Sequence, residues 1–146
     1  MPCPRLATRA VILHQGQLLL VNAWPGNESM LWCAPGGGVE RGTSLPDNLA
    51  REVFEETGLR IAVGQPCLVN EFHDPGGSFH QVELFFRCTV TDGTLRDDWL
   101  DPEGIVHKRR WFSRSDVADL HLKPDSLRTL PWQEGVLYDP LEALVK

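Results

Sequence analysis

The chain has 146 residues, of which 42% are hydrophobic and 23% are charged. These proportions are typical of a folded globular domain and argue against a largely disordered chain. The formal net charge of −6 disfavours a partner bound mainly through its phosphate backbone, such as duplex DNA. An acidic protein can still bind a small phosphorylated ligand when metal ions supply the positive charge. We therefore expect a single domain over residues 1–146 with no nucleic-acid partner.

The four cysteines are widely spaced, without a Cys-x-x-Cys pair or a Cys/His cluster at zinc spacing. This pattern favours reduced, mostly buried thiols at Cys3, Cys33, Cys67 and Cys88. No apolar run approaches the ~20 residues that span a bilayer. The first five residues, Met-Pro-Cys-Pro-Arg, lack the long apolar stretch of a signal peptide. We expect a soluble, cytoplasmic protein without a membrane partner.

The first half of the chain predicts a hairpin, a glycine-rich loop and a helix. Apolar runs at 6–13 and 17–21 flank Gly16 and favour a β-hairpin. After a loop at 23–30 and a short strand at 31–34, three glycines follow Pro35. Because glycine permits positive φ angles and close approach to a ligand, we expect a loop rather than a strand at 36–38.

A helical period follows over residues 45–57. Ser44 is placed to cap its N-terminus, and Pro46 stands in the first turn, where a missing N–H does little harm. Gly58 is placed to end the helix in the left-handed conformation.

Further strands are expected at 61–63, 67–71, 81–90 and 108–113, with a turn at 74–77 and a polar loop at 96–104. Ser115 or Asp116 is the expected cap of a short helix that ends near Leu120. The remaining residues are expected to form short helical pieces on the outside. Mixed strands with a few helices indicate an α/β or α+β sandwich.

Three carboxylates stand at helical spacing in the predicted helix. Glu52, Glu55 and Glu56 fall on one face, where like charges repel. Hard divalent cations such as Mg²⁺ prefer oxygen ligands, so this face is expected to be exposed and to bind metal. Arg51 lies four residues before Glu55 and is placed to orient its carboxylate. The alternative is a solvated acidic face balanced by Arg51 and Arg60.

Residues 37–59 resemble the Nudix box, Gly-x5-Glu-x7-Arg-Glu-U-x-Glu-Glu-x-Gly-U, in which U is a bulky aliphatic residue. Residues 32–40 also resemble the usual lead-in to this box. Eight of the nine specified positions match: Gly37, Arg51, Glu52, Val53, Glu55, Glu56, Gly58 and Leu59. The resemblance implies an α/β/α sandwich with a mixed β-sheet. It also implies hydrolysis of a nucleoside diphosphate linked to another group.

On this resemblance, Glu55 and Glu56 are the first metal ligands, and Glu52 is either a further ligand or the base that activates water. A carbonyl of the glycine loop often adds a ligand, which makes Gly36, Gly37 and Gly38 candidates for binding. Oxygen ligands without histidine or cysteine favour Mg²⁺ or Mn²⁺ over Zn²⁺. Divalent cations neutralise phosphate charge and lower the pKa of water, so a nearby carboxylate can remove its proton.

The chain departs from the family pattern at two places. Thr43 stands where the first glutamate of the box is usual, and Glu40 is near enough in sequence to replace it. The late strand at 107–111 lacks the acidic residue that often precedes its tryptophan. Glu103 is the nearest upstream candidate for a second base, and Glu83 on the long strand is another.

Specificity lies outside the box, so the expected partner is a small-molecule nucleotide of unspecified class. Nucleoside triphosphates, ADP-ribose, nucleotide sugars and dinucleoside polyphosphates all remain open, as does a homodimer. One rival function is a non-enzymatic nucleotide sensor, and another is isoprenoid diphosphate isomerisation through Cys33 or Cys67. Five aromatic residues are candidates for base stacking, with packing as the favoured alternative for each: Trp24, Trp32, Phe72, Phe79 and Trp99. Four arginines are candidates for contacts with distal phosphates, with a solvated side chain as the alternative for each: Arg5, Arg9, Arg41 and Arg87.

Overall fold

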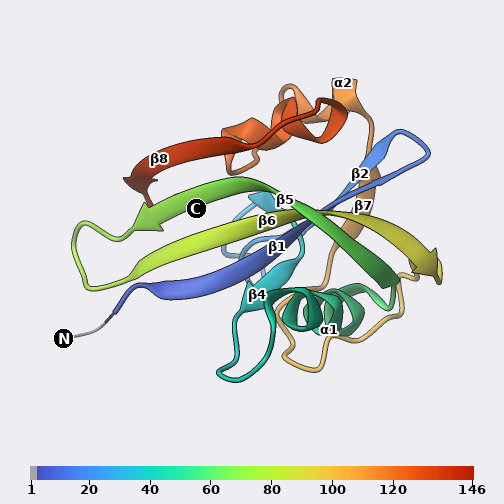
Figure 1. Cartoon of the computed structure of the whole chain (residues 1–146), viewed down its shortest axis with the longest axis horizontal. Coiled ribbons are helices and arrows are strands. Elements are labelled where there is room, and N and C mark those ends of the chain that lie inside the picture. Colours follow the sequence, from blue (N-terminus) through green and yellow to red (C-terminus); the bar gives the residue numbers. More distant parts are fainter. Residues whose placement is uncertain (1–2) are drawn as a thin grey trace.

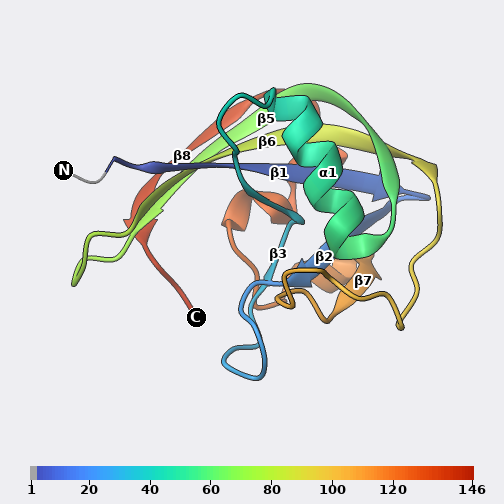
Figure 2. The same cartoon turned by 90° about the horizontal axis from the view of Figure 1, so that it is seen from below.

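A computed structural model describes residues 3–146, so Met1 and Pro2 of the predicted domain lie outside the described residues. A mixed sheet forms the centre of the fold in the strand order β3-β2-β1-β6-β5-β8, with β4 paired to β1 and β7 paired to β2. Helix α1 lies on one side of this sheet and the short helices lie on the other (Figures 1 and 2). The expected α/β/α sandwich is confirmed.

The helical elements are α1 (Leu45–Thr57), α2 (Arg114–Val117) and two 3-10 turns, η1 (Asp125–Arg128) and η2 (Leu130–Trp132). The strands are β1 (Arg5–His14), β2 (Gln17–Asn22), β3 (Trp32–Cys33), β4 (Gly36–Gly38), β5 (Arg60–His73), β6 (His80–Asp92), β7 (Arg109–Phe112) and β8 (Leu137–Ala143). Strands β1 and β2 form the predicted antiparallel hairpin, and β1 runs parallel to β6.

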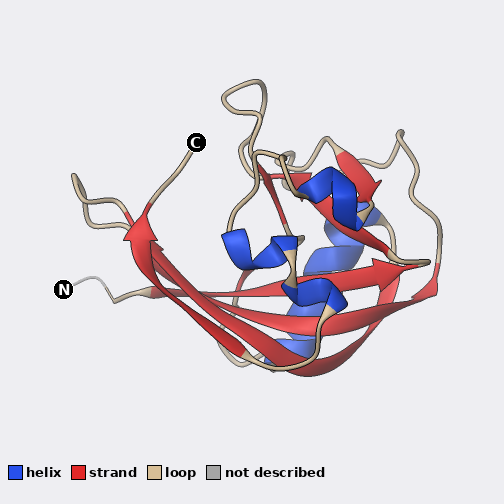
Figure 3. Ribbon diagram, turned by 90° about the horizontal axis from the view of Figure 1, so that it is seen from above, coloured by secondary structure: helices blue, strands red, loops and turns tan. Residues whose placement is uncertain are grey.

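Buried apolar residues form two cores, one on each face of the sheet. Alternate residues of β1 divide between them, so that Ile12 packs beneath α1 while Val11 packs beneath the short helices. Figure 3 shows the long strands curving beneath the short helices. Because both faces are covered, the polar side chains of Gln81 and Glu83 on β6 are buried as well.

Four local predictions were wrong. The three glycines form strand β4 against β1, where a side chain on Gly36 would place its Cβ 2.0 Å from the carbonyl oxygen of Thr8. The two strands predicted at 61–63 and 67–71 are one irregular strand, β5. Ser113 caps the short helix α2, which ends at Val117 instead of near Leu120. The C-terminal part holds a strand, β8, because parallel pairing with β5 stabilises a segment without a strong strand pattern of its own.

The four cysteines are free thiols with different exposure. Cys67 and Cys88 are buried, Cys33 is half-buried and Cys3 is exposed, so the expectation of mostly buried thiols holds for part of the set. Within residues 3–146, no helix is long and apolar enough to span a membrane.

Candidate active site

Helix α1 begins and ends as its sequence predicts. The side chain of Ser44 accepts a hydrogen bond from the backbone N–H of Asp47 at 3.2 Å. Gly58 adopts a φ of 77° and donates its N–H to the carbonyl of Phe54, which ends the helix. These two local signals fix which residues of the box lie on the last two turns, where its carboxylates stand.

The structure brings Glu103 to the carboxylates of α1. Oxygen atoms of Glu52, Glu55 and Glu103 all lie within 4.8 Å of one another, and we call these three residues the carboxylate trio. Glu103 stands on residues 93–108, between β6 and β7, which we call the acid loop. Glu103, a candidate for the second base, therefore lies beside α1 although it is 48 residues from Glu55 in sequence.

The predicted exposure of the carboxylate face was wrong for Glu52, which is only 6% exposed. Its carboxylate packs against Gly37, where a Cβ atom would come within 2.7 Å of it. Burial raises the pKa of Glu52, while Arg51 opposes that rise. Glycine at position 37 therefore leaves the space that the buried carboxylate occupies.

Arg51 bridges the acidic residues around α1. Its Nη1 lies 3.2 Å from both carboxylate oxygens of Glu55, and its Nη2 lies 3.2 Å from Glu52. The same Nη2 is 3.3 Å from Glu40, which stands three residues before Thr43. Glu40 therefore supplies a carboxylate to the box arginine from a neighbouring position, and Ser44 rather than Thr43 caps the helix.

Glu56 is not one of the trio, and its carboxylate is bonded to β4. Its Oε1 accepts the backbone N–H of Gly36 at 3.0 Å. Burial raises the pKa of Glu56 to about 8, although the nearby Arg9 guanidinium and the Gly36 N–H both act to lower it. Its role as a metal ligand stays a prediction.

Two polar residues that were not predicted from the sequence, Asp101 and Asn22, hold the acid loop by hydrogen bonds. Asp101 accepts three backbone N–H groups, from Glu103 at 3.0 Å, Ile105 at 3.2 Å and Val106 at 2.8 Å. Asn22, on β2, accepts the N–H of His107 and donates to the carbonyl of Ile105, both at 2.8 Å. The Asp-Pro pair at 101–102 signals a turn, but the partner of Asn22 lies 85 residues away.

A cavity of about 380 Å³ opens on the short-helix side of the sheet. Strands β1, β5 and β6 and the last residues of the chain line it. Glu83 lies in its wall and accepts hydrogen bonds from Arg9 at 2.6 Å, Gln81 at 3.0 Å and Asn70 at 3.2 Å. Glu83 is thus a buried partner of an arginine, and it is not part of the carboxylate trio.

Gly36 connects the cavity wall to α1. Its carbonyl accepts a hydrogen bond from Nη1 of Arg9 at 3.3 Å, and its N–H is donated to Glu56. Arg9 also binds Glu83, so one arginine contacts both the cavity wall and β4. The carbonyl of Gly38 accepts from the side chain of Asn48 at 3.1 Å. The carbonyls of Gly36 and Gly38, both proposed as metal ligands, thus already have side-chain partners.

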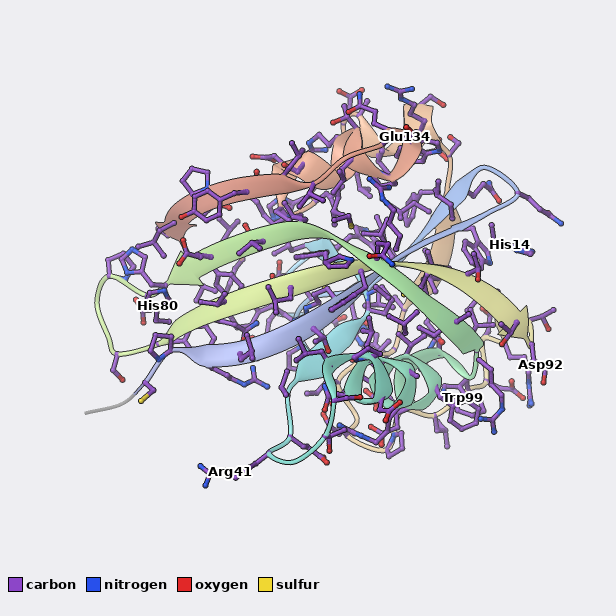
Figure 4. The ribbon with its side chains drawn as sticks, in the orientation of Figure 1. His14, Arg41, His80, Asp92, Trp99 and Glu134 are labelled. Atoms are coloured by element: carbon purple, nitrogen blue, oxygen red, sulfur yellow. The ribbon has the colours of Figure 1, made fainter. Side chains whose placement is uncertain are left out.

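The aromatic candidates divide by position. Trp24, Phe72 and Phe79 line the cavity. Trp32 instead packs edge-on against Phe112, with ring centroids 5.0 Å apart. Trp99 lies at the C-terminal end of α1, remote from the cavity lining (Figure 4). Three of the five therefore stand in the cavity wall, where Phe72 and Phe79 also pack on each other with ring centroids 5.8 Å apart.

The arginine candidates divide in the same way. Arg5 and Arg9 line the cavity. Arg87 donates to the carbonyls of Leu130 and Gly135, which places it among the C-terminal turns. Arg41 extends from the exposed tip of the loop that precedes α1 (Figure 4).

The two cysteines of the isomerase alternative have different surroundings. Cys33 lines the cavity, and burial raises the pKa of its thiol to about 12, which keeps it protonated at neutral pH. Cys67 is fully buried in the core beneath the short helices.

Comparison with known proteins gives a match to the family model described as NUDIX domain over residues 4–133. A Bacillus subtilis (strain 168) protein named "Putative ADP-ribose pyrophosphatase YjhB" is 30% identical over 95 residues, which are 63% of this chain and 44% of that protein. The chain thus spans less than half the length of this curated relative. A NUDIX hydrolase structure from Nitrosomonas europaea has a TM-score of 0.75 at 19% identity and covers 99% of this chain and 81% of its own. A crystal structure of a UDP-X diphosphatase has a TM-score of 0.68 at 23% identity. The match covers 95% of this chain and 68% of that protein's chain.

Proposed function

Because the chain belongs to the NUDIX domain family, we propose that it hydrolyses a phosphoanhydride bond in a nucleoside diphosphate linked to another group. The observation that carries this proposal is the carboxylate trio, in which Glu103 joins Glu52 and Glu55 within 4.8 Å. A helix and a loop with only structural roles would rarely bring three carboxylates together, because like charges repel and destabilise the fold. A cationic ligand would relieve that repulsion.

The trio fits Mg²⁺ or Mn²⁺. Its donors are all carboxylate oxygens, without the histidine or cysteine that would favour zinc. When bound, a divalent cation would neutralise charge on the diphosphate and lower the pKa of the attacking water. Glu56 is a further candidate ligand by its match to the box, and its carboxylate is bonded to Gly36 of β4.

We assign the proton-accepting role to Glu103. Its side chain is exposed on the acid loop and can reach water, whereas Glu52 is buried against Gly37. A carboxylate within hydrogen-bond reach of the attacking water can accept its proton. Arg51 would hold Glu55 in place through two contacts of 3.2 Å.

The cavity is the proposed binding place for the nucleoside. Trp24, Phe72 and Phe79 offer apolar walls for a base, and Arg5 and Arg9 offer positive charge for phosphate. A chain of two hydrogen bonds supports a link to the proposed metal site, since Arg9 of the cavity wall donates to the carbonyl of Gly36 and the N–H of Gly36 is donated to Glu56. The names of two similar proteins favour ADP-ribose and UDP-linked compounds among the four open substrate classes.

Two contacts argue against the sensor alternative. It depended on Thr43 and on the missing acid before Trp111. Glu40 contacts Arg51 at 3.3 Å, and Glu103 reaches the trio from farther upstream than the usual acid.

The proposal is tested by measuring phosphate or nucleotide release from ADP-ribose, UDP-sugars, nucleoside triphosphates and dinucleoside polyphosphates. Each substrate is assayed with Mg²⁺, with Mn²⁺ and with excess chelator. We expect turnover of at least one diphosphate-linked nucleotide, abolished by chelation. Absence of turnover across the panel, or turnover undiminished by chelator, would contradict the proposal.

A further inference from the structure

The C-terminal end of α1 is bonded by side chains from outside the helix. The last four carbonyl groups of a helix lack intrahelical partners. Here the indole Nε1 of Trp99 donates to the carbonyl of Glu55 at 2.8 Å, and the guanidinium Nε of Arg109 donates to the carbonyl of Glu56. The backbones of two predicted ligand residues are therefore bonded to the acid loop and to β7.

The ring of Trp99 is also fixed by packing. It lies edge-on to Phe54, with ring centroids 5.3 Å apart and an interplanar angle of 72°. It also covers Gly58, where a Cβ atom would come within 2.8 Å of the indole. Glycine at position 58 thus serves both the left-handed turn and the close approach of the indole.

A short segment of the acid loop, held by hydrogen bonds, connects Trp99 to Glu103. The two residues are four positions apart, and Asp101 between them accepts the backbone N–H of Glu103. On the far side, Arg109 donates to the carbonyl of Val106 at 3.0 Å. The acid loop is thereby attached to the end of α1 at both sides of Glu103.

We propose that Trp99 is a positioning residue, which docks the acid loop on the end of α1 and so sets the distance of Glu103 from Glu52 and Glu55. The catalytic part of this inference rests on the proposed function, whereas the docking itself does not. Positioning matters because a catalytic group displaced by about 1 Å can lose a large part of its effect.

Trp99→Phe isolates the indole N–H, since phenylalanine retains an aromatic ring against Phe54 and Gly58. Trp132→Phe is the matched control, because the Trp132 indole also donates to a backbone carbonyl, that of Gly16, at 2.9 Å. Amide hydrogen exchange of residues 101–108 is measured without metal or substrate. We expect faster exchange in Trp99→Phe and no change in Trp132→Phe, with the β1 and β6 amides unchanged as the measure of folding.

Turnover of the four proteins in a double-mutant cycle then tests whether Trp99 acts through Glu103. Trp99→Phe should lower kcat about five- to tenfold, the value of one hydrogen bond, with a smaller effect on KM. In the Glu103→Gln background, the same change should have no further effect. Fully additive losses would overturn the inference.

The two proposals fail differently. If acid-loop exchange is the same in wild type and Trp99→Phe, the docking role of Trp99 is wrong whatever the turnover. If exchange rises as expected but the wild-type protein hydrolyses no nucleotide, the docking role stands and the proposed function is wrong.

Discussion

Glu56→Gln separates the chemistry of the site from its stability. The Gly36 N–H would still be accepted by the glutamine side-chain oxygen, so the local geometry is retained. In the wild-type protein, burial raises the pKa of Glu56 from 4.5 to about 8. Between these two values the native state holds a proton that the unfolded chain has lost. The free energy of unfolding therefore falls as pH rises through this window.

The size of the effect follows from the same two pKa values. Each pKa unit corresponds to about 1.4 kcal/mol. The difference between 4.5 and about 8 therefore means that the ionised Glu56 carboxylate lowers the free energy of unfolding by at most roughly 5 kcal/mol. Glutamine carries no such cost. We expect the stability of Glu56→Gln relative to wild type, without metal, to grow by at least about 1 kcal/mol between pH 5.5 and 8.5, or about 3 °C in Tm.

Added Mg²⁺ should stabilise the wild-type protein more than Glu56→Gln. A metal ion stabilises the native state only in proportion to its binding, so loss of a ligand should shrink the rise in Tm that Mg²⁺ produces. Turnover should fall at least ~100-fold, a barrier increase of about 2.7 kcal/mol. Melting curves at both pH values, with and without Mg²⁺, are measured beside a turnover assay. A variant with near-wild-type turnover and an undiminished Mg²⁺ response would refute the assignment of Glu56 to the metal site.

Two further substitutions test the box itself. Thr43→Glu should leave kcat within about tenfold, because Glu40 already contacts Arg51; a gain of several orders of magnitude would show that Thr43 cripples the natural protein. Gly37→Ala should lower both Tm and turnover, because the added Cβ would lie 2.7 Å from the Glu52 carboxylate. Gly42→Ala is the control for loss of a glycine, because Gly42 has a φ of 82° but open space around a Cβ atom. This variant should keep wild-type turnover at a temperature where it stays folded. Equal turnover losses in the two alanine variants would contradict the role given to Gly37.

Local signals made the box helix predictable. Ser44 and Gly58 act on backbone groups within four residues of themselves, so the sequence around each is enough to place the helix ends. The spacing of Glu52 and Glu55 then puts both on one side of α1. The sequence of a single helix does not show which segments pack against it. Burial of Glu52 against Gly37 was not predicted because it depends on how β4 pairs with β1.

The rest of the site depends on contacts between distant segments. Glu103 was a candidate only because it was the nearest acid upstream of the late strand, and its meeting with α1 depends on the docked acid loop. The indole of Trp99 was expected to stack on a base or to pack, and it packs. Strand β8 was missed because its own residues carry little strand pattern and its pairing with β5 supplies the order.

The most direct test of the account is turnover by Glu103→Gln beside Glu134→Gln. Glu134 is an exposed carboxylate among the C-terminal turns, at the opposite end of the molecule from α1 (Figure 4). With saturating Mg²⁺ and the best substrate of the panel, Glu103→Gln should lose at least ~100-fold in kcat, while Glu134→Gln should match wild type. Equal turnover by all three proteins would show that the carboxylate trio does not perform the reaction.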